Sequence, residues 1–489
     1  MKQLEKSDIQ EIIKESRAKL KPLGLRNADD QIPQLTWIFL LKCIDDFEIR
    51  REGTIPRYKP IIPKPYRWRD WASDPVKGLS GDDLINYILT DLFPGLKKLT
   101  AGKGLEQRIS IISIFSSINN RIQDGYKLRE IINDVDKIDF KNTKTVKIFA
   151  EVYEDLIIEM RNSAENRAVF YTPKAVVQFI VNKIKPNFKN DEKVFDPACG
   201  MGGFLLESFN FMKKDEKSST DIENLRYKTL YGSEKEGEYY LCATMNMLLH
   251  DIDKPNLTKE NSLSHDTRLI TEKDQYQIIM TNPTYGGPED KSVKKNLPHS
   301  MKGASSEMHF LYFVTQSLRE DGRGAIIMPN GVLFDSSKSA QEIKGNLFQK
   351  CNVHTIIRLP ESMFAPYTSI QTNILFFEKT GPTKEICYYS MPLRGGIKSY
   401  NKTNPPTLDD FKTLTEWCKD KKENDNDNAW LVKVEDIKDY NLDIKNPKDK
   451  DESVDLSPHE LISQIISDER KTLKLLEDVK GLIDKEIPK

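Results

Sequence analysis

From about residue 165 onward, short apolar segments of strand length alternate with longer segments that have the periodicity of helices. Parallel strands need a crossover connection, usually a helix, so this alternation predicts an α/β fold with a doubly wound parallel sheet. No helix-length pattern separates Thr355–Leu359 from Thr372–Phe377, which predicts an antiparallel strand at the end of the sheet. The predicted strands are Val194–Phe195, Leu230–Tyr231, Ile278–Met280, Ala325–Met328 and Thr355–Ile357, and the predicted helices are 174–185, 203–213, 237–250, 307–319 and 338–350.

The first 160 residues have a different pattern, which predicts an all-helical N-terminal domain. Apolar residues recur at intervals of three and four along Leu35–Phe47 and Phe149–Ile157, and this spacing gives each helix one apolar face. A proline-rich bridge, Pro56–Pro65, lies between them. We therefore expect a helical domain at 1–160, a sheet domain at 161–446, and a linker with a C-terminal helix at 447–489.

The C-terminal helix follows a charged linker and begins with the N-cap and first-turn pair Ser457–Pro458. One stripe of this helix is apolar and the remaining positions are charged. Such a helix either packs back on its own domain or inserts into the coiled coil of a partner. The stripe consists of Ile462, Ile466, Leu473, Leu476, Val479 and Ile483.

The charge balance restricts how the chain can hold nucleic acid. A protein that grips DNA by itself usually has an excess of Lys and Arg, because phosphate contacts supply much of the affinity. The formal net charge here is -1. A nucleic-acid ligand would therefore need a local basic groove or a partner subunit.

The six cysteines are scattered without a C-x-x-C pair, which predicts free thiols and argues against a disulfide framework or a metal site. No stretch approaches the roughly 20 apolar residues of a membrane helix, and the N-terminal residues lack the apolar centre of a secretory signal. We therefore expect a cytoplasmic protein.

A glycine-rich turn, Asp196–Phe204, follows one predicted strand and opens a helix. Glycines let the chain approach a ligand closely, and a helix N-terminus offers free N–H groups. The turn lacks the P-loop ending and the spacing G-x-G-x-x-G, which disfavours triphosphates and NAD. Asp196 suits a cationic ligand, and Glu234, after the next strand, stands where related sheets bind ribose hydroxyls. S-adenosylmethionine has both a sulfonium cation and a ribose.

The segment Asn282–Tyr285 follows the apolar run Ile278–Met280, at the point where a buried strand would end. The Asn282 side-chain carbonyl and the Pro283 main-chain carbonyl are two acceptors, which suit the two hydrogens of an exocyclic amine. Methylating such an amine depends on positioning and electrostatics rather than on a strong base. Tyr285 would stack on a base flipped into the pocket. The alternative is that Asn-Pro forms only a turn.

Together these elements resemble the modification subunits of type I restriction-modification systems, which are DNA adenine-N6 methyltransferases. The resemblance covers nearly the whole chain, including the helical N-terminal part and the C-terminal helix. It implies a Rossmann-like doubly wound methyltransferase sheet and transfer of a methyl group from S-adenosylmethionine to a flipped adenine. The segments that carry it are Val169–Lys174, Asp196–Phe204, Tyr231–Glu234, Asn282–Gly287, Gly322–Phe334 and Asn441–Asp443.

The resemblance also implies site residues and partners. The target adenine would be held by Asn282, Pro283 and Tyr285. Implied partners are double-stranded DNA, a DNA-specificity subunit that engages the C-terminal helix, and a motor-nuclease restriction subunit, with two modification subunits per complex. The implied cofactor site comprises Phe170, Tyr171, Thr172, Pro173, Asp196, Pro197, Ala198, Gly200, Gly202, Gly203, Phe204, Glu234 and Asn261.

Two positions depart from the family pattern. Thr284 stands where the family usually has proline, and Asn261 lies where it often has an aspartate. Both acceptors and the aromatic ring remain, so we expect an active enzyme. Two alternatives stay open: a catalytically silent scaffold that binds the cofactor, or an N-methyltransferase acting on protein glutamine or on RNA.

Overall fold

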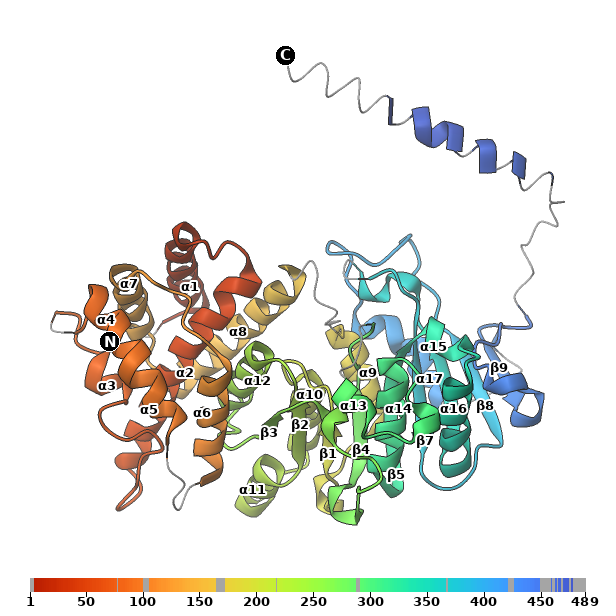
Figure 1. Ribbon diagram of the computed structural model, residues 1–489, viewed down its shortest axis with the longest axis horizontal. Coiled ribbons are helices and arrows are strands. Elements are labelled where there is room, and N and C mark those ends of the chain that lie inside the picture. The colour runs from red at the N-terminus through yellow and green to blue at the C-terminus, as the bar shows by residue number, and fades with distance from the viewer. Residues whose placement is uncertain are drawn as a thin grey trace. The chain divides into compact units, whose positions relative to one another are not determined.

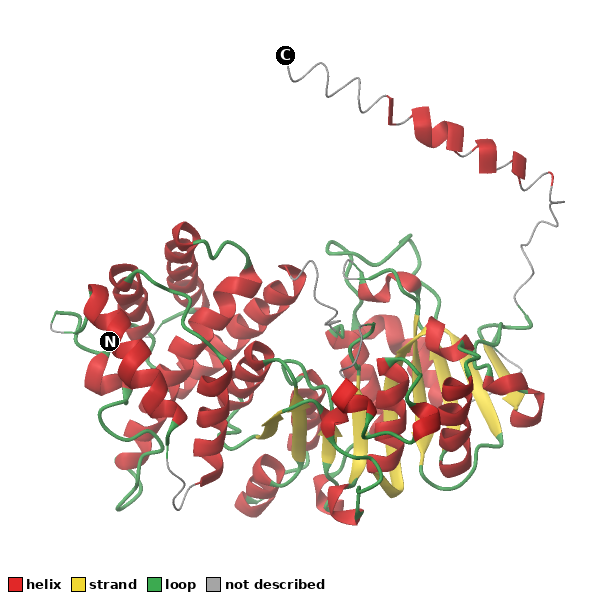
Figure 2. Cartoon of the chain, in the orientation of Figure 1, coloured by secondary structure: helices red, strands yellow, loops and turns green. Residues whose placement is uncertain are grey.

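The computed structural model (Figures 1 and 2) divides into two compact units, Met1–Ile444 and Lys445–Lys489. In the described part of the chain, no helix is long and apolar enough to cross a membrane. All six cysteines are free thiols, as predicted. The structure describes residues 4–76, 78–99, 105–163, 172–216, 218–286, 291–365, 368–420 and 426–448, and residues 459, 462–463, 465–467, 469–474 and 476–477.

The described residues before 164 form helices and loops without a strand. On α8 the predicted apolar face is present, with Phe149, Tyr153 and Leu156 buried in the core. The helices are α1 (Lys6–Leu20), α2 (Ala28–Glu52), α3 (Trp68–Trp71), α4 (Gly81–Tyr87), α5 (Phe93–Lys97), α6 (Leu105–Ser117), α7 (Gly125–Asp136) and α8 (Thr143–Ser163).

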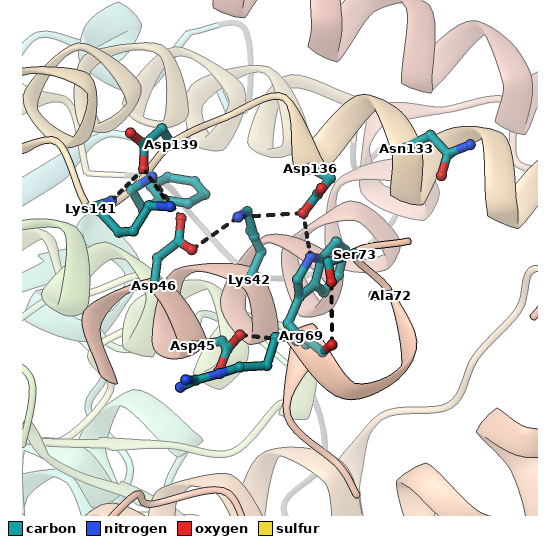
Figure 3. Close-up of polar contacts among 12 residues, drawn as sticks. Lys42, Asp45, Asp46, Arg69, Ala72, Ser73, Asn133, Asp136, Asp139 and Lys141 are labelled. Carbon is teal, nitrogen blue, oxygen red and sulfur yellow. Dashed lines mark hydrogen bonds and ion pairs between the residues drawn. The ribbon is translucent and has the colours of Figure 1, made fainter. Parts of the chain in front are cut away.

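The prediction of a single apolar face is wrong for α2. Every residue from Gln31 to Glu48 is buried, so neighbouring helices surround this one on all sides. Its buried residues Lys42, Asp45 and Asp46 form ion pairs instead of facing solvent, because an unpaired buried charge is costly. Figure 3 shows Lys42 Nζ between Asp46 Oδ1, at 2.9 Å, and Asp136 Oδ1, at 3.4 Å.

A nine-stranded sheet forms the second half of this unit, in the order β3-β2-β1-β4-β5-β7-β6-β8-β9. The first five strands in that order are parallel, which confirms the doubly wound α/β prediction. The strands are β1 (Val194–Asp196), β2 (Leu230–Glu234), β3 (Asn256–Lys259), β4 (Tyr276–Thr281), β5 (Leu318–Pro329), β6 (Asn352–Arg358), β7 (Thr372–Glu378), β8 (Glu385–Ser390) and β9 (Ala429–Lys433).

Helices cover both faces of the sheet. One apolar core contains residues of α9 (Lys174–Ile184), α10 (Gly203–Lys213) and α12 (Gly237–Leu249), and the other contains residues of α14 (Ser306–Ser317) and α16 (Lys338–Lys350). The strand order runs from β1 through β2 to β3 on one side and from β4 to β5 on the other, so the direction of chain progression reverses between β1 and β4. In such a sheet, ligands bind outside the carboxyl ends of the strands near this switch point.

Strand β7 is antiparallel, as predicted, but its predicted place at the end of the sheet is wrong. It lies between β5 and β6 and pairs with both, so that Leu375 is opposite Ile326 on one side and Ile356 on the other. The crossover through α16 carries the chain one position past β5, and β7 fills the place left between the two strands. Strands β8 and β9 then extend the sheet beyond β6.

Besides several short 3-10 helices, the described part of this unit contains four further, smaller α-helices and a π-helical turn. They are α11 (Ser219–Tyr227), α13 (Lys291–Lys294), α15 (Asn330–Phe334), α17 (Lys412–Asp420) and a π-helical turn at Ile88–Leu92. In the second unit, the described residues between 459 and 477 are helical and exposed. Four residues of the predicted stripe, Ile462, Ile466, Leu473 and Leu476, are exposed, whereas Val479, Ile483 and the pair Ser457–Pro458 lie outside the described residues.

Candidate active site

The segment Asn282–Gly286 begins where β4 ends. The last strand residues, Ile278–Thr281, are all buried, and the chain leaves the sheet at its carboxyl edge. Loops that follow β1, β2 and β3 leave the same edge, since these strands are parallel neighbours. The structure therefore gathers the predicted base-binding and cofactor-binding segments along one edge.

The carboxamide of Asn282 is fixed by two hydrogen bonds. Its Nδ2 donates to Thr172 Oγ1 at 3.0 Å, and its Oδ1 accepts from the Tyr285 hydroxyl at 2.5 Å. Only 9% of Asn282 and 4% of Tyr285 is exposed. The acceptor expected to take an amine hydrogen is thus already bonded to the tyrosine in this structure.

Tyr285 acts as a neutral donor in this arrangement. Burial, followed by the nearby charge of Glu307, raises the pKa of the Tyr285 hydroxyl well above its ordinary value. The proton therefore stays on the tyrosine at any physiological pH. Pro283, whose main-chain carbonyl is the other predicted acceptor for the amine, lies between Asn282 and Tyr285 in the chain and is buried.

Asp196 links the cofactor turn to the catalytic strand. Its Oδ1 accepts from the Thr281 hydroxyl at 2.8 Å and from the Ala198 backbone N–H at 3.1 Å. Burial raises the pKa of Asp196 to about 7, although both hydrogen bonds lower it. The carboxylate thus lies beneath the glycine turn, next to the residue that precedes Asn282.

The glycine turn needs glycine for two separate reasons. Gly200 and Gly202 have positive φ values of 54° and 82°, which side chains of L-residues rarely adopt. A Cβ atom on Gly202 would lie 2.7 Å from Met247 Cε, whereas a Cβ on Gly200 or Gly203 would meet nothing within 4 Å. The turn therefore packs tightly on one side and borders open space on the other, as a cradle for a cofactor requires.

Glu234, at the end of β2, is held by backbone N–H groups from both sides. Gly200 N donates to its Oε2 at 2.9 Å, and Glu236 N donates to its Oε1 at 2.8 Å. Burial raises the pKa of Glu234 to about 7. Each carboxylate oxygen retains a lone pair, so the group is placed to accept a hydrogen bond from a ribose hydroxyl beside Gly200.

The remaining predicted cofactor residues occupy supporting positions. Pro173 is the N-cap of α9, Asn261 Oδ1 accepts from Leu263 N at 3.0 Å, and Phe204 is buried in the core. Ser262 Oγ donates to the carbonyl of Pro197 at 2.7 Å, which ties the loop after β3 to the glycine turn. Phe170 and Tyr171 lie outside the described residues.

Two residues of the segment Gly322–Phe334, Arg323 and Asn330, make hydrogen bonds within the fold. Arg323 forms a bidentate pair with Glu192, with both N–O distances 2.9 Å, and also donates to the carbonyl oxygens of Ile184 and Lys185 after α9. Asn330 accepts a hydrogen bond from Asn373 on β7 at 3.1 Å. Arg323 thus ties β5 to the C-terminal end of α9, and Asn330 ties the start of α15 to β7.

Sequence patterns had no means of indicating two of the residues that contact the site, Thr281 and Glu307, and they gave Thr172 only one of its contacts. Thr281 ends a buried strand, and only the pairing of β1 with β4 brings it to Asp196. Thr172 was expected at the cofactor and lies against Asn282. Glu307, at the start of α14, accepts a hydrogen bond from Gly286.

A doubly wound sheet with a glycine turn, an acidic residue after the second strand and an Asn-Pro segment after the fourth defines an amino-methyltransferase. The family model described as N-6 DNA Methylase matches residues 144–455. The Type I restriction enzyme EcoEI methylase subunit of Escherichia coli is 37% identical over 453 residues, which is 91% of each chain.

Solved structures agree with these matches. A chain described as a modification subunit of a type I restriction enzyme from Vibrio vulnificus YJ016 is 36% identical, with a TM-score of 0.81, covering 92% of this chain and 99% of that one. A chain solved for complex assembly and conformational transition of the type I R-M system is 30% identical, with a TM-score of 0.77, covering 98% and 99%. The chain belongs to the N-6 DNA methylase family, and it is an adenine-specific DNA methyltransferase of the type I restriction-modification kind.

Proposed function

We propose that the chain transfers the methyl group of S-adenosylmethionine to the N6 amine of an adenine flipped out of double-stranded DNA. The observation that supports this most is the fixed carboxamide of Asn282, which lies between Thr172 and Tyr285 at the edge where the glycine turn also ends. The cofactor supplies a methyl group on a cationic sulfur, ready for attack by a nitrogen lone pair.

The task of the chain is then to position that lone pair. In free adenine the lone pair of the exocyclic nitrogen is delocalised into the ring. When Asn282 Oδ1 and the Pro283 carbonyl accept the two amine hydrogens, the nitrogen is drawn toward a pyramidal geometry and its lone pair points at the methyl group. The N–C bond forms as the S–C bond breaks, and one proton is released for each methyl group transferred. Preorganised acceptors make this possible without a strong base.

We assign one rearrangement at the site to adenine binding. Asn282 Oδ1 has two lone pairs and can accept from the amine, and when the Tyr285 hydroxyl gives up this oxygen its ring can stack on the base. The exchange replaces one hydrogen bond by another. It also exposes a ring that is buried in the resting structure.

The fit of the cofactor follows from the residues around the turn. Two carboxylates, Asp196 and Glu234, favour a cationic ligand with ribose hydroxyls, and the backbone at Gly200 and Gly203 borders open space where the ligand can approach. Thr172 and Pro173 lie at the start of α9, next to Asn282, where the methionine end would lie.

DNA recognition needs other chains. The net charge of -1 leaves little general attraction for phosphate, which fits a subunit that works beside a DNA-specificity subunit and a motor-nuclease subunit. We assign the exposed C-terminal helix to the specificity subunit and two modification subunits to each complex. The complex would act in the cytoplasm, with the DNA that it modifies.

Transfer of a labelled methyl group from S-adenosylmethionine to duplex DNA, with and without the co-expressed specificity subunit, tests the proposal. We expect incorporation only with the specificity subunit, and its loss on Asn282→Ala. Asn404→Ala, an exposed asparagine whose side chain makes no hydrogen bond among the described residues, is the matched control. Bound cofactor with no transfer under either condition would instead indicate the silent scaffold, and methylation of RNA or protein in place of DNA would indicate the other alternative.

A further inference from the structure

The catalytic loop is anchored at its far end by a carboxylate from another element. The backbone N–H of Gly286 donates to Glu307 Oε1 at 2.6 Å, a short distance that is typical of a charged acceptor. Glu307 is 6% exposed, although glutamate is rarely buried without a partner. The bond connects the residue that follows Tyr285 to a position 21 residues further along the chain.

Helix α14 is a suitable anchor for this bond. Residues Ser306–Thr315 are all buried, so the helix is fixed between the sheet and the surrounding loops. Glu307 is in its first turn, where the free N–H groups of the helix stabilise a negative charge. The same charge disfavours ionisation of Tyr285, which keeps the tyrosine a hydrogen-bond donor.

Gly286 has to adopt an unusual conformation to make the contact. Its φ is 67°, in the left-handed region that favours glycine, while a Cβ there would meet nothing within 4 Å. The requirement is therefore for the backbone angle and not for space. The turn at Gly286 directs its N–H toward Glu307 on α14.

The loop has a specific need for such an anchor. Thr284 lacks the ring that would fix its φ, so the loop between Pro283 and Tyr285 has one more free backbone angle than a loop with two prolines. No hydrogen bond among the described residues involves Thr284. The loop is therefore held by the bonds of Asn282 at one end and by the bond of Gly286 at the other.

We propose that Glu307 is a positioning residue for methyl transfer: it holds Gly286 so that Asn282, Pro283 and Tyr285 keep the geometry that the adenine amine needs, in place of the missing proline ring. This inference rests on the proposed function. Glu307 acts through the loop and touches neither the base nor the cofactor. Removing it should therefore slow the transfer step without weakening cofactor binding.

Kinetics of the complex with the specificity subunit provide the first test. We expect Glu307→Ala to lower kcat by about 10- to 100-fold, the range that follows when reacting groups are misplaced by about 1 Å. The Kd for S-adenosylmethionine should change by less than about 2-fold. Glu307→Gln keeps an oxygen acceptor and should retain most of the activity, and Thr284→Pro in the Glu307→Ala background should restore part of the lost kcat. Glu223→Ala, an exposed glutamate on α11, is the control.

Hydrogen exchange of the whole chain tests the anchor without relying on methyl transfer. Amides of the segment 282–286 should exchange more slowly in the wild type than in Glu307→Ala, with Glu223→Ala matching the wild type. Should Glu307→Ala fail to fold, Glu307→Met keeps the side-chain length without the acceptor and replaces it. Unchanged exchange would refute the anchor, and an unchanged kcat in an active complex would refute the positioning role. A wild-type complex with no transfer contradicts the proposed function and leaves the exchange result to decide the anchor.

Discussion

Asn282 Nδ2 lies 3.0 Å from Thr172 Oγ1, although 110 residues separate the two in the chain. In this arrangement the amide nitrogen donates to Thr172 and the amide oxygen accepts from the Tyr285 hydroxyl, so the two bonds together hold the carboxamide. A side chain that was assigned to the cofactor from the sequence therefore also orients the residue that receives the base.

Replacing Thr172 by valine should separate these two roles. Valine has nearly the same shape but cannot accept the hydrogen bond, so the carboxamide of Asn282 becomes free to rotate. We expect kcat for DNA methylation to fall by about 10-fold, equivalent to about 1.4 kcal/mol. Thr172→Ser, which keeps the hydroxyl, should stay within about 3-fold of the wild type. Equal rates for both variants in single-turnover assays would contradict the orienting role.

Tyr285→Phe should lower the stability of the protein without weakening DNA binding. Loss of the hydroxyl leaves Asn282 Oδ1 buried without its donor, which should lower the free energy of unfolding by about 1–3 kcal/mol. The adenine amine then has no competitor for that oxygen, so the KM for DNA should not rise. Urea unfolding and steady-state kinetics measure the two effects. A higher KM with unchanged stability would show that the bond does not compete with the base.

Cofactor affinity should rise with pH between about 6 and 8. The pKa values of Glu234 and Asp196 are both raised to about 7 by burial, so both groups lose a proton over this range. A cationic ligand and its ribose hydroxyls favour the ionised carboxylates, and binding should therefore release protons near pH 7. Calorimetry in buffers of different ionisation enthalpy measures this release. Glu234→Gln should reduce it, whereas Glu223→Gln should not.

The same shift predicts a change in stability. Glu234 has a folded-state pKa above its ordinary value of 4.5, so its contribution to stability falls as pH rises from about 4.5 to 7. Glu234→Gln removes this penalty. The difference in the free energy of unfolding, variant minus wild type, should therefore be more positive at pH 8 than at pH 5. Urea titration without cofactor measures it.

Gly202→Ala and Gly203→Ala should have different consequences. Alanine at position 202 is strained by the positive φ and contacts Met247, so the free energy of unfolding should fall by about 1–2 kcal/mol or more. At position 203 the added Cβ enters open space, so stability should be retained while cofactor binding weakens. Thermal unfolding with a cofactor titration distinguishes the two. Equal stability of both variants would contradict the packing described for the turn.

Much of the sheet follows from the sequence because its central strands are apolar on both faces. Strands such as β4 and β5 are covered by helices on both sides and read as continuous runs. Strand β3, Asn256–Lys259, contains one apolar residue and offers no such run. The position of β7 depends on how far the α16 crossover reaches, which local sequence does not encode.

The candidate site divides in a similar way. Residues within short motifs, such as Gly200 or Asn282, are indicated by their neighbours in the sequence. Thr281 and Glu307 meet the site through strand pairing and helix packing, so their roles become visible only in three dimensions. The helix α2 shows the same limit, because a regular spacing of apolar residues does not reveal that Lys42 and Asp46 are buried as a pair.

The bond between Thr281 and Asp196 means that a change at one of these two positions affects what the other can be. A substitution at Asp196 takes away the acceptor of the buried Thr281 hydroxyl, and a substitution at Thr281 leaves Asp196 Oδ1 with only the Ala198 N–H, directly beneath the two ligand sites. Exchanging the glycine turn or the catalytic loop between relatives should therefore succeed only when both residues travel together. A chimera that contains only one of the two residues would keep both motifs intact but lose the hydrogen bond that joins β1 to β4 beneath them.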